Sequence, residues 1–411
     1  MTGRIRIGIV GGGLAGIIVA IALVKHPHVD VQVYESAPNF IERGAGIGLS
    51  PLTLEALDDI IPSAVGFLKT HAGAVEVDAA RLVGSGPEAG ALISDLGVAA
   101  GVTMNRAPLL QALLSLLSGD MLHAAKRVKS LEQTDSDVTV AFEDGTDAHF
   151  DAVIGADGIY SSVGNHVVGE EPKYAASPAG WWDCRHLVPF EKARAALGDE
   201  SFKVNRQYAW LGDGAAMLHG IVENRTMVQC IIAVIDKNLS SDRKRVVTRQ
   251  VLENALPASW YEGPVAKGMV EKTQRVMLFG NTNPRLPTYV NNRVCIAGDA
   301  AHTTSPWQGA GAGMAIEDAF ILGHLFGNVS SVGEINAAFR AFDALRRPRC
   351  QRIIDTGRDT GRLFCGQDEV AGLDAKKINE SLGLAFARVG ALDLESHKND
   401  ALETMRAFLG S

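Results

Sequence analysis

The stretch IRIGIVGGGLAGIIVAIAL, residues 5–23, decides the fold class of this chain. Its first six residues are rich in isoleucine and valine, as in a buried strand, and a glycine cluster and a long apolar run follow. The stretch VDVQVYE, residues 29–35, has the pattern of a second strand. The order of strand, glycine turn, helix and strand predicts a βαβ unit and therefore an α/β fold with a parallel sheet.

The turn of this unit carries the spacing G-x-G-x-x-G at Gly11, Gly13 and Gly16, and the second strand ends at Glu35. In such a turn the first glycine permits a tight bend, the second lets a pyrophosphate approach the backbone, and the third lets helix and strand pack closely. The helix N-terminus offers N–H groups to phosphates, and an acid at the strand end can bind ribose hydroxyls. The unit predicts a dinucleotide site, and its spacing does not distinguish FAD from NAD.

Composition narrows the class of protein. The 411 residues carry a formal net charge of −8, so we expect neither a nucleic acid nor an anionic membrane as a partner. The five cysteines are scattered and form no CxxC pair, which predicts a reduced, cytoplasmic protein without a metal site. The first strand begins too early for a secretion signal, and no apolar run outside the glycine-containing first helix favours a membrane span. We expect a monomer or a homodimer.

A second glycine-rich segment, GDAAHTTSPWQGAGAGMAIEDA at residues 298–319, follows the predicted buried strand RVCIAG. Asp299 stands at the end of that strand, where a carboxylate can bind sugar-like hydroxyls, and the helix that begins near Gly311 directs amides at an electron-rich group. Arg106 opens another predicted helix and could pair with a phosphate, and Asp157 ends another predicted strand. Taken alone, Arg106 is better explained as a surface arginine, and an Asp-Gly pair at a strand end is common in plain turns.

The middle of the chain has a different character. Residues 176–275 hold four of the tryptophans and the strand-like run MVQCIIAVI, which indicates a separate, sheet-rich substrate domain. The predicted boundaries are 1–75, 100–175 and 276–365 for the nucleotide-binding domain, 76–99 and 176–275 for the substrate domain, and 366–411 for a C-terminal helical segment.

Three motifs in order resemble a known family: GGGLAG with Glu35, GADG at 155–158, and GDAAH…P…GAGAG…AIEDA at 298–319. They are similar to those of class A FAD-dependent aromatic monooxygenases, the group that includes salicylate hydroxylase and para-hydroxybenzoate hydroxylase. RRPR at 346–349 also resembles a feature of this family, and the fungal polyketide phenol hydroxylases are the most similar subgroup. The resemblance implies an α/β, Rossmann-like FAD-binding domain, the para-hydroxybenzoate hydroxylase fold, with an inserted β-sheet substrate domain and C-terminal helices.

The resemblance also implies the cofactors and the reaction. FAD would be bound tightly but not covalently, and NAD(P)H would bind transiently, which agrees with a single G-x-G-x-x-G. The implied reaction is hydroxylation of a small phenolic or other aromatic substrate with O2 through a flavin C4a-hydroperoxide. The cofactor-binding residues implied by the family motifs, from the AMP half to the isoalloxazine, are Gly11, Gly13, Gly16, Glu35, Arg43, Gly46, Arg106, Asp157, Asp299, Pro306, Gly309 and Gly311.

Two residues are implied to act on the substrate. Arg185, in WWDCRHLVP, would hold a phenolate or carboxylate, and His219, in WLGDGAAMLHGIV, would face the flavin. Without the family, Arg185 would be a salt-bridged strand residue and His219 a core histidine. The chain departs from the family at Gly164, where an arginine normally follows the DG motif, and at Gly220, where close relatives have tyrosine. Gly164 bears on NAD(P)H handling, and Gly220 enlarges the predicted pocket.

Several other functions stay compatible with these residues. An epoxidase or oxidase of the same fold would use the same flavin chemistry, and a decarboxylating or dearomatising hydroxylase would share the substrate class. A flavin-binding protein without turnover is the alternative from another class. Secondary metabolism and aromatic catabolism are both consistent with the resemblance.

Overall fold

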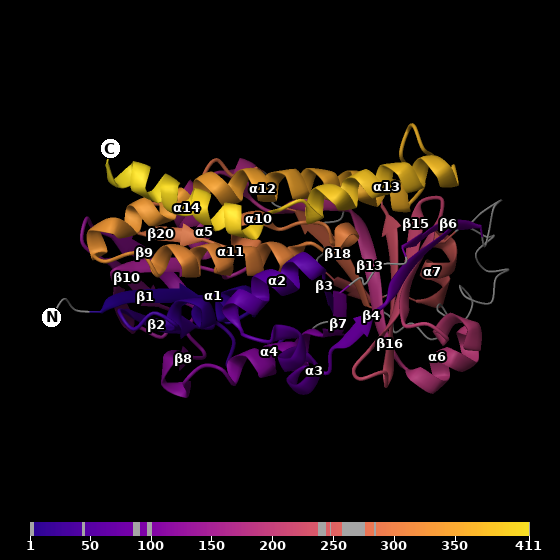
Figure 1. The fold of residues 1–411 in the computed structure, drawn as a ribbon, viewed down its shortest axis with the longest axis horizontal. Coiled ribbons are helices and arrows are strands. Elements are labelled where there is room, and N and C mark those ends of the chain that lie inside the picture. Colours follow the sequence, from indigo (N-terminus) through magenta and orange to yellow (C-terminus); the bar gives the residue numbers. More distant parts are fainter. Residues whose placement is uncertain are drawn as a thin grey trace.

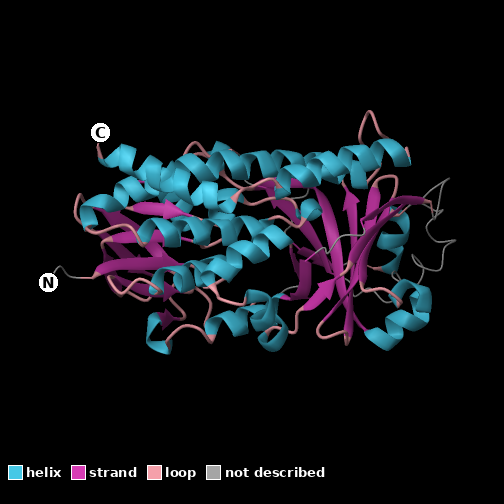
Figure 2. Ribbon diagram, in the orientation of Figure 1, coloured by secondary structure: helices cyan, strands magenta, loops and turns pink. Residues whose placement is uncertain are grey.

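The computed structural model describes residues 4–42, 46–84, 91–96, 101–236, 244–246, 248–256, 276–282 and 285–410. Its strands gather in two groups toward opposite ends of an elongated molecule, and helices cover one side of both groups (Figure 2). The long helices near the C-terminus run across the top of the view and connect the two ends (Figure 1). No helix within the described ranges combines the length and apolar content that crossing a membrane requires.

The N-terminal group is built on a six-stranded sheet with the order β19-β20-β12-β1-β2-β8. β1 pairs in parallel with β2 and β12, and β12 pairs in parallel with β20. The central strands are rich in valine and isoleucine, and these side chains are buried. Their bounds are Ile5–Val10 (β1), Val29–Tyr34 (β2), Leu122–His123 (β8), Ala152–Gly155 (β12), Val290–Asn291 (β19) and Val294–Ile296 (β20).

The glycine loop leads directly into α1 (Leu14–Val24), which packs against α11 (Gly311–Phe326). A Cβ at Gly323 would stand 3.0 Å from Cβ of Ala22, so this glycine lets the two helices approach. α2 (Pro51–Ile60) also packs on α11; Ser50 caps its N-terminus by accepting a hydrogen bond from Thr53 N, and proline occupies its first turn. The other helices of this part are α3 (Ala64–His71), α4 (Arg106–Leu114), α5 (Ser162–Val168) and α10 (Asp299–His302).

Two small antiparallel sheets accompany this layer. One consists of β9 (Val128–Gln133), β10 (Val138–Phe142) and β11 (Asp147–Phe150), and the other of β3 (Gly46–Leu49), β4 (Val75–Val77) and β7 (Gly101–Asn105). The second of these sheets is bonded to the other end of the molecule. Thr103 Oγ1 donates to the carbonyl of Ile221 at 3.0 Å, and Asn105 Nδ2 donates to Glu223 Oε1 at 2.5 Å.

The C-terminal group of strands is one eight-stranded sheet with the order β17-β18-β13-β16-β15-β14-β5-β6. One face buries a cluster around Trp182 and Met217, and the other contributes Leu82 and Leu211 to a cluster with Phe364. The strands are β5 (Ala79–Gly84), β6 (Leu92–Leu96), β13 (Ser177–Pro189), β14 (Arg206–Leu211), β15 (Ala215–Val222), β16 (Met227–Ile235), β17 (Lys244–Val246) and β18 (Val276–Thr282).

Helix α12 (Ile335–Phe364) connects the two ends. Its 30 residues correspond to about 45 Å. Phe339 and Phe342 are buried in the core of the N-terminal group, whereas Phe364 packs on the eight-stranded sheet. The remaining helices are α6 (Phe190–Leu197), α7 (Arg249–Ala255), α13 (Ala375–Gly390) and α14 (Leu394–Leu409), with short 3₁₀ turns at Gly119–Met121, Pro172–Tyr174, Asp199–Phe202, Pro306–Gln308 and Val332–Glu334.

Candidate cofactor and substrate site

The fold itself requires two of the three glycines in the first loop. Gly11 has φ of +113°, and a Cβ there would stand 2.2 Å from the carbonyl oxygen of Ala156. A Cβ at Gly16 would stand 2.0 Å from the carbonyl oxygen of Gly11. Gly13 differs, because it has φ of −76° and a Cβ there would meet no atom within 4 Å. The space in front of Gly13, at the N-terminus of α1, is therefore open to a ligand.

Glu35 points from the end of β2 toward the same loop. Its Oε2 accepts a hydrogen bond from the backbone N–H of Gly12 at 2.8 Å, and its Oε1 accepts one from Ala37 N at 2.7 Å. The carboxylate is thus fixed in place. Because each carboxylate oxygen has a second lone pair, it can still accept hydrogen bonds from ribose hydroxyls.

Charged side chains converge beside this loop. Arg106 Nη2 lies 3.5 Å from Glu42 Oε2, and the Nε of Arg106 is buried without a hydrogen-bond partner. Burial raises the pKa of Glu42, the carboxylates of Asp299 and Glu35 add to this, and Arg106 opposes it. A partly exposed guanidinium whose buried Nε–H has no partner fits a phosphate or carbonyl oxygen of a bound cofactor. Arg43 lies outside the described residues.

The second glycine segment lies directly against the first. A Cβ at Gly298 would stand 2.6 Å from Cβ of Ala15 in α1, and Asp299 begins α10 immediately after β20. Pro306 starts a 3₁₀ turn, and Gly309 has φ of +63°, which favours glycine. Gly311 then begins α11. The backbone amides at the start of α11 are thereby placed at the same end of the sheet as those of α1.

Asp157 lies just before helix α5 and binds the backbone of its first turn. Its carboxylate accepts hydrogen bonds from Ser161 Oγ, from Ser162 N at 2.7 Å and from Val163 N at 3.2 Å. Burial raises the pKa of Asp157, and these hydrogen bonds act in the opposite direction. A Cβ at Gly164, in α5, would stand 3.6 Å from the carbonyl oxygen of Ala300 and so would face the second loop.

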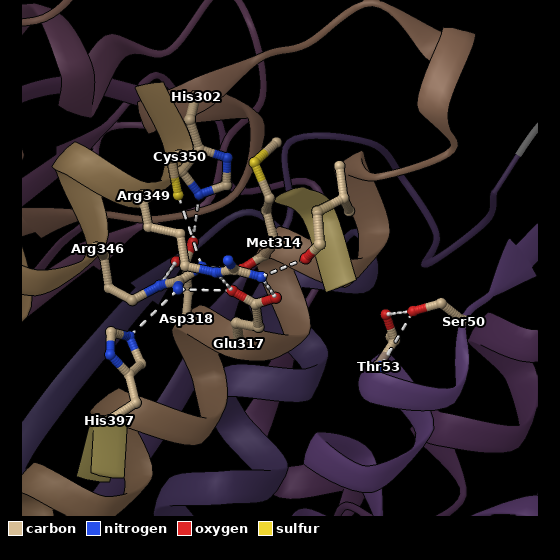
Figure 3. A network of polar contacts seen from close by, with 11 residues as sticks. Ser50, Thr53, His302, Met314, Glu317, Asp318, Arg346, Arg349, Cys350 and His397 are labelled. Atoms are coloured by element: carbon tan, nitrogen blue, oxygen red, sulfur yellow. Dashed lines mark hydrogen bonds and ion pairs between the residues drawn. The ribbon is translucent and has the colours of Figure 1, made fainter. Parts of the chain in front are cut away.

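A buried ion network lies behind the second loop (Figure 3). Arg346, on α12, donates to Asp318 Oδ1 at 2.9 Å and to Glu317 Oε2 at 2.6 Å, both on α11. Arg349 Nε donates to Glu317 Oε2 at 2.7 Å. His302 Nε2 lies 2.5 Å from Asp318 Oδ2. Because every one of these side chains is nearly or completely shielded from solvent, each charge depends on its partners in the network.

Asp318 connects this network to the backbone of the second loop. Its Oδ2 also accepts a hydrogen bond from Gly298 N at 2.9 Å. Burial alone would raise the pKa of Asp318, but the charges of His302 and Arg346 hold it at about 2. Burial alone would lower the pKa of His302, but the Asp318 carboxylate raises it well above its ordinary value. An ionised carboxylate therefore fixes the turn that presents Asp299.

Three members of this region carry metal-ligating atoms: His302, Asp318 and Cys350 bring theirs within 4.8 Å of one another. Arg346 Nη2, however, lies 3.6 Å from Cys350 Sγ, so a guanidinium already supplies positive charge at that point. All five cysteines of the chain are free and buried. We assign no ion to this cluster.

A small pocket opens where the sheet of β3 and β7 meets the eight-stranded sheet. Gly46 and Gly220 both line it. The carboxamide oxygen of Gln229 packs against Gly46, since a Cβ there would stand 2.2 Å from Gln229 Oε1. The lining residues are Gly46, Ile47, Gly48, Thr103, Gln207, Leu218, Gly220, Val222 and Gln229.

A family model described as an FAD binding domain matches residues 4–356 of the chain. The chain belongs to the FAD-dependent monooxygenases. It is 33% identical over 416 residues to the 6-methylsalicylate 1-monooxygenase of Aspergillus terreus, which covers 97% of this chain and 92% of that relative. It is 31% identical over 428 residues to a salicylate hydroxylase of Pseudomonas putida, covering 99% and 96%.

Solved structures agree on the fold of this FAD-dependent monooxygenase. A substrate complex of salicylate hydroxylase matches with a TM-score of 0.85 at 24% identity, covering 97% of this chain and 98% of that one. CtdE in complex with FAD and a substrate also matches with a TM-score of 0.85, at 19% identity, covering 99% and 100%. These structures confirm the predicted fold class, and the family model and the relatives confirm the predicted family and its FAD cofactor.

The monooxygenase places Arg185 on the pocket face of the eight-stranded sheet. Arg185 pairs with Ile231 of β16, and Ile231 pairs with the pocket residue Leu218 of β15. Nε and Nη2 of Arg185 each donate to one oxygen of Asp183 at 2.9 Å. The Asp183 side chain is 2% exposed and that of Arg185 27%. Burial would lower the pKa of Arg185, and Asp183 outweighs this and raises it.

His219 lies on the opposite face of that sheet. Its neighbours Leu218 and Gly220 line the pocket, and side chains alternate along a strand. The ring stacks on Tyr208 with 4.8 Å between centroids, and its Nδ1 accepts a hydrogen bond from Trp210 Nε1 at 3.3 Å. Burial lowers the pKa of His219 to about 4. The structure does not bring His219 to the pocket, and its surroundings are those of a neutral core histidine.

Two features of the site escape sequence reasoning. The RRPR stretch signals Arg346 and Arg349, but only the fold pairs them with Glu317 and Asp318 across two helices. Gln229 is a polar residue inside the apolar run MVQCIIAVI. That contrast is a usable signal, because a polar side chain in a buried strand needs a specific partner.

Proposed function

We propose that this monooxygenase uses NAD(P)H and O2 to hydroxylate a small phenolic or other aromatic ring. The observation that carries the proposal is the pocket lined by residues of β3, β7 and the eight-stranded sheet, in a chain that belongs to the FAD-dependent monooxygenases. Ile47, Leu218 and Val222 contribute apolar surface to its lining, beside the polar side chains of Thr103, Gln207 and Gln229. The names of the relatives, a 6-methylsalicylate 1-monooxygenase and a salicylate hydroxylase, support a small aromatic substrate.

The residues around the two glycine loops fit FAD. The backbone amides at the N-terminus of α1, which follows Gly13, would hold the pyrophosphate, and Glu35 would bind the adenosine ribose. Asp299 and Arg106 would contact the ribityl and phosphate region, and the N-terminus of α11 would face the flavin ring. FAD, when bound, supplies electron transfer from NAD(P)H and the activation of O2. We further propose that the eight-stranded sheet is the substrate domain and that the nicotinamide cofactor binds only transiently.

The first test is the absorption spectrum of the purified protein, followed by NADH and NADPH oxidation with a panel of phenols and a panel of alkenes. We expect a bound flavin and faster oxidation of one nicotinamide cofactor when a hydroxylated ring is added. Acceleration by alkenes alone would indicate an epoxidase. A flavin-loaded protein that no ring accelerates would contradict the proposed hydroxylation.

A further inference from the structure

The short turn before α11, residues 305–309, is docked on the second half of α12. Gln308 Nε2 donates a hydrogen bond to Thr360 Oγ1 at 3.0 Å, and the Thr360 hydroxyl donates in turn to the carbonyl of Thr356 at 2.8 Å. Thr356 Oγ1 also lies 3.3 Å from Gln308 Oε1, but its one hydrogen can instead be donated to carbonyls of its own helix. Because Thr360 is completely buried, its hydroxyl is a fixed acceptor for the turn.

Two glycines of α12 let the rest of the turn come close. A Cβ at Gly361 would stand 2.4 Å from Trp307 Nε1, and a Cβ at Gly357 would stand 3.1 Å from Ser305 Oγ. Both glycines are buried in the interior of the helix, where glycine is less favourable than alanine. The sequence of α12 therefore accepts a weaker helix at the positions that receive Ser305 and Trp307.

The remaining residues of the turn are open to a ligand. Pro306 and Gly309 are exposed, whereas Ser305, Trp307 and Gln308 contact α12. The family motif places Pro306 and Gly309 beneath the isoalloxazine. α12 thus holds the turn through one set of residues and leaves the other set free for the flavin.

The turn also reaches the eight-stranded sheet. The Trp307 ring meets Trp181 of β13 edge-to-face, with 5.8 Å between the ring centroids, and meets Phe364 of α12 at 6.2 Å. A displacement of the turn would therefore disturb the cofactor side and the sheet side together.

We propose that Gln308, held by Thr360, is a positioning residue that fixes this turn for FAD. Thr360 is buried and acts only through Gln308, whose hydrogen bond fixes the backbone between Pro306 and Gly309. The inference rests on the proposed placement of the flavin ring at the N-terminus of α11. A turn that is already held in one conformation loses less conformational entropy when FAD binds, so the hydrogen bond strengthens cofactor binding.

The test measures the dissociation constant of FAD by calorimetry on the cofactor-free protein. Thr360→Val keeps the shape of the side chain and removes the hydroxyl, and Gln308→Met keeps the length and removes the donor. Each should bind FAD about tenfold more weakly. Thr360→Ser keeps the hydroxyl and should stay within about twofold of the natural protein. Thr288→Val is the matched control, because it removes a hydroxyl that donates to the carbonyl of Val290 at 3.0 Å, and FAD affinity should be unchanged.

The double variant Gln308→Met with Thr360→Val tests whether the two residues act through one bond. It should lose about tenfold, as each single variant does, because the same interaction is removed. A loss of about a hundredfold would show independent effects and overturn the proposal.

Three further results would overturn the role of Gln308. They are an unchanged FAD affinity in Gln308→Met, a loss in Gln308→Met without one in Thr360→Val, and an equal loss in Thr360→Ser and Thr360→Val. Even if Thr360→Val fails to fold, the first of these results decides, because Gln308 lies on a partly exposed turn. The rate of NAD(P)H oxidation with aromatic rings tests the proposed function separately, since FAD affinity does not depend on turnover.

Discussion

Asp318 accepts a hydrogen bond from the backbone N–H of Gly298 at 2.9 Å, although the two residues are 20 positions apart in the chain. The same carboxylate is held by Arg346 and His302. A charge network spanning α11 and α12 therefore supports the turn that presents Asp299. Arg346 of the RRPR stretch has this supporting role directly and Arg349 joins the network through Glu317, whereas Arg347 pairs with Asp343.

We predict that Asp318→Asn destabilises the protein by about 3–5 kcal/mol, because Arg346 would keep its buried charge after losing a partner. It should also lower the fraction of FAD retained after gel filtration. Urea unfolding and flavin absorbance measure the two effects. Glu171→Gln is the control, since Glu171 pairs with Lys173 at an exposed site, where loss of the pair should leave stability nearly unchanged. Equal stability of the two variants would show that the network is not needed.

Arg185→Gln should weaken substrate binding while FAD is retained, and it should destabilise the fold because Asp183 would stay buried without its partner. The double variant Asp183→Asn with Arg185→Gln separates the two effects. It removes the unpaired charge, so most of the stability should return while substrate affinity stays low. Titration of the natural protein and both variants with the best hydroxylated ring measures this. If affinity returns together with stability, Arg185 acts only on the fold.

His219 gives a prediction for the dependence of stability on pH. Its folded pKa of about 4 lies below the ordinary value of 6.5, so the unfolded state binds more protons between these values. Stability should therefore be lost as the pH falls from 6.5 toward 4, by about 3 kcal/mol from this residue. His219→Phe keeps the stacking on Tyr208 and removes the titration. Urea midpoints at pH 7 and pH 4.5 should show a smaller loss in the variant, and an identical loss would refute the neutral core histidine.

The first loop can be tested with two matched alanine substitutions. Gly11→Ala should destabilise even the cofactor-free protein by more than about 1 kcal/mol, because the position has positive φ and its Cβ would meet Ala156. Gly13→Ala meets no protein atom, so the cofactor-free protein should keep its melting temperature within a few degrees. Its affinity for FAD should nevertheless fall at least tenfold. Normal FAD affinity in Gly13→Ala would show that no pyrophosphate lies at this turn.

The glycine loops and their strands were predictable because their constraints are local. Gly11 and Gly16 are needed by the chain's own backbone, and the βαβ pattern around them is decided within one short stretch. The run at 146–154, which reads as one strand, is divided in the structure into β11 and β12. A turn at Asp151 separates the two strands. The carboxylate of Asp151 binds Arg6, and because Arg6 is distant in sequence, the local pattern does not reveal this turn.

Side-chain direction on the eight-stranded sheet could not be predicted. A shift of one residue moves a side chain to the other face, so the sequence alone could not separate His219 from Gly220. The pairing of β15 with β16 decides which residue faces the pocket, because Gly220 lies opposite the pocket residue Gln229 and His219 lies opposite Cys230. Gln229 enters the site only through this pairing.

The most direct test of the account is oxygen labelling. The protein is incubated with FAD, its preferred nicotinamide cofactor, a hydroxylated ring and ¹⁸O₂, and the product is analysed by mass spectrometry. We predict one ¹⁸O atom in each product molecule and none when only the water is labelled. NAD(P)H consumption that yields hydrogen peroxide and an unlabelled ring, for every ring tested, would contradict the assignment of an aromatic hydroxylase.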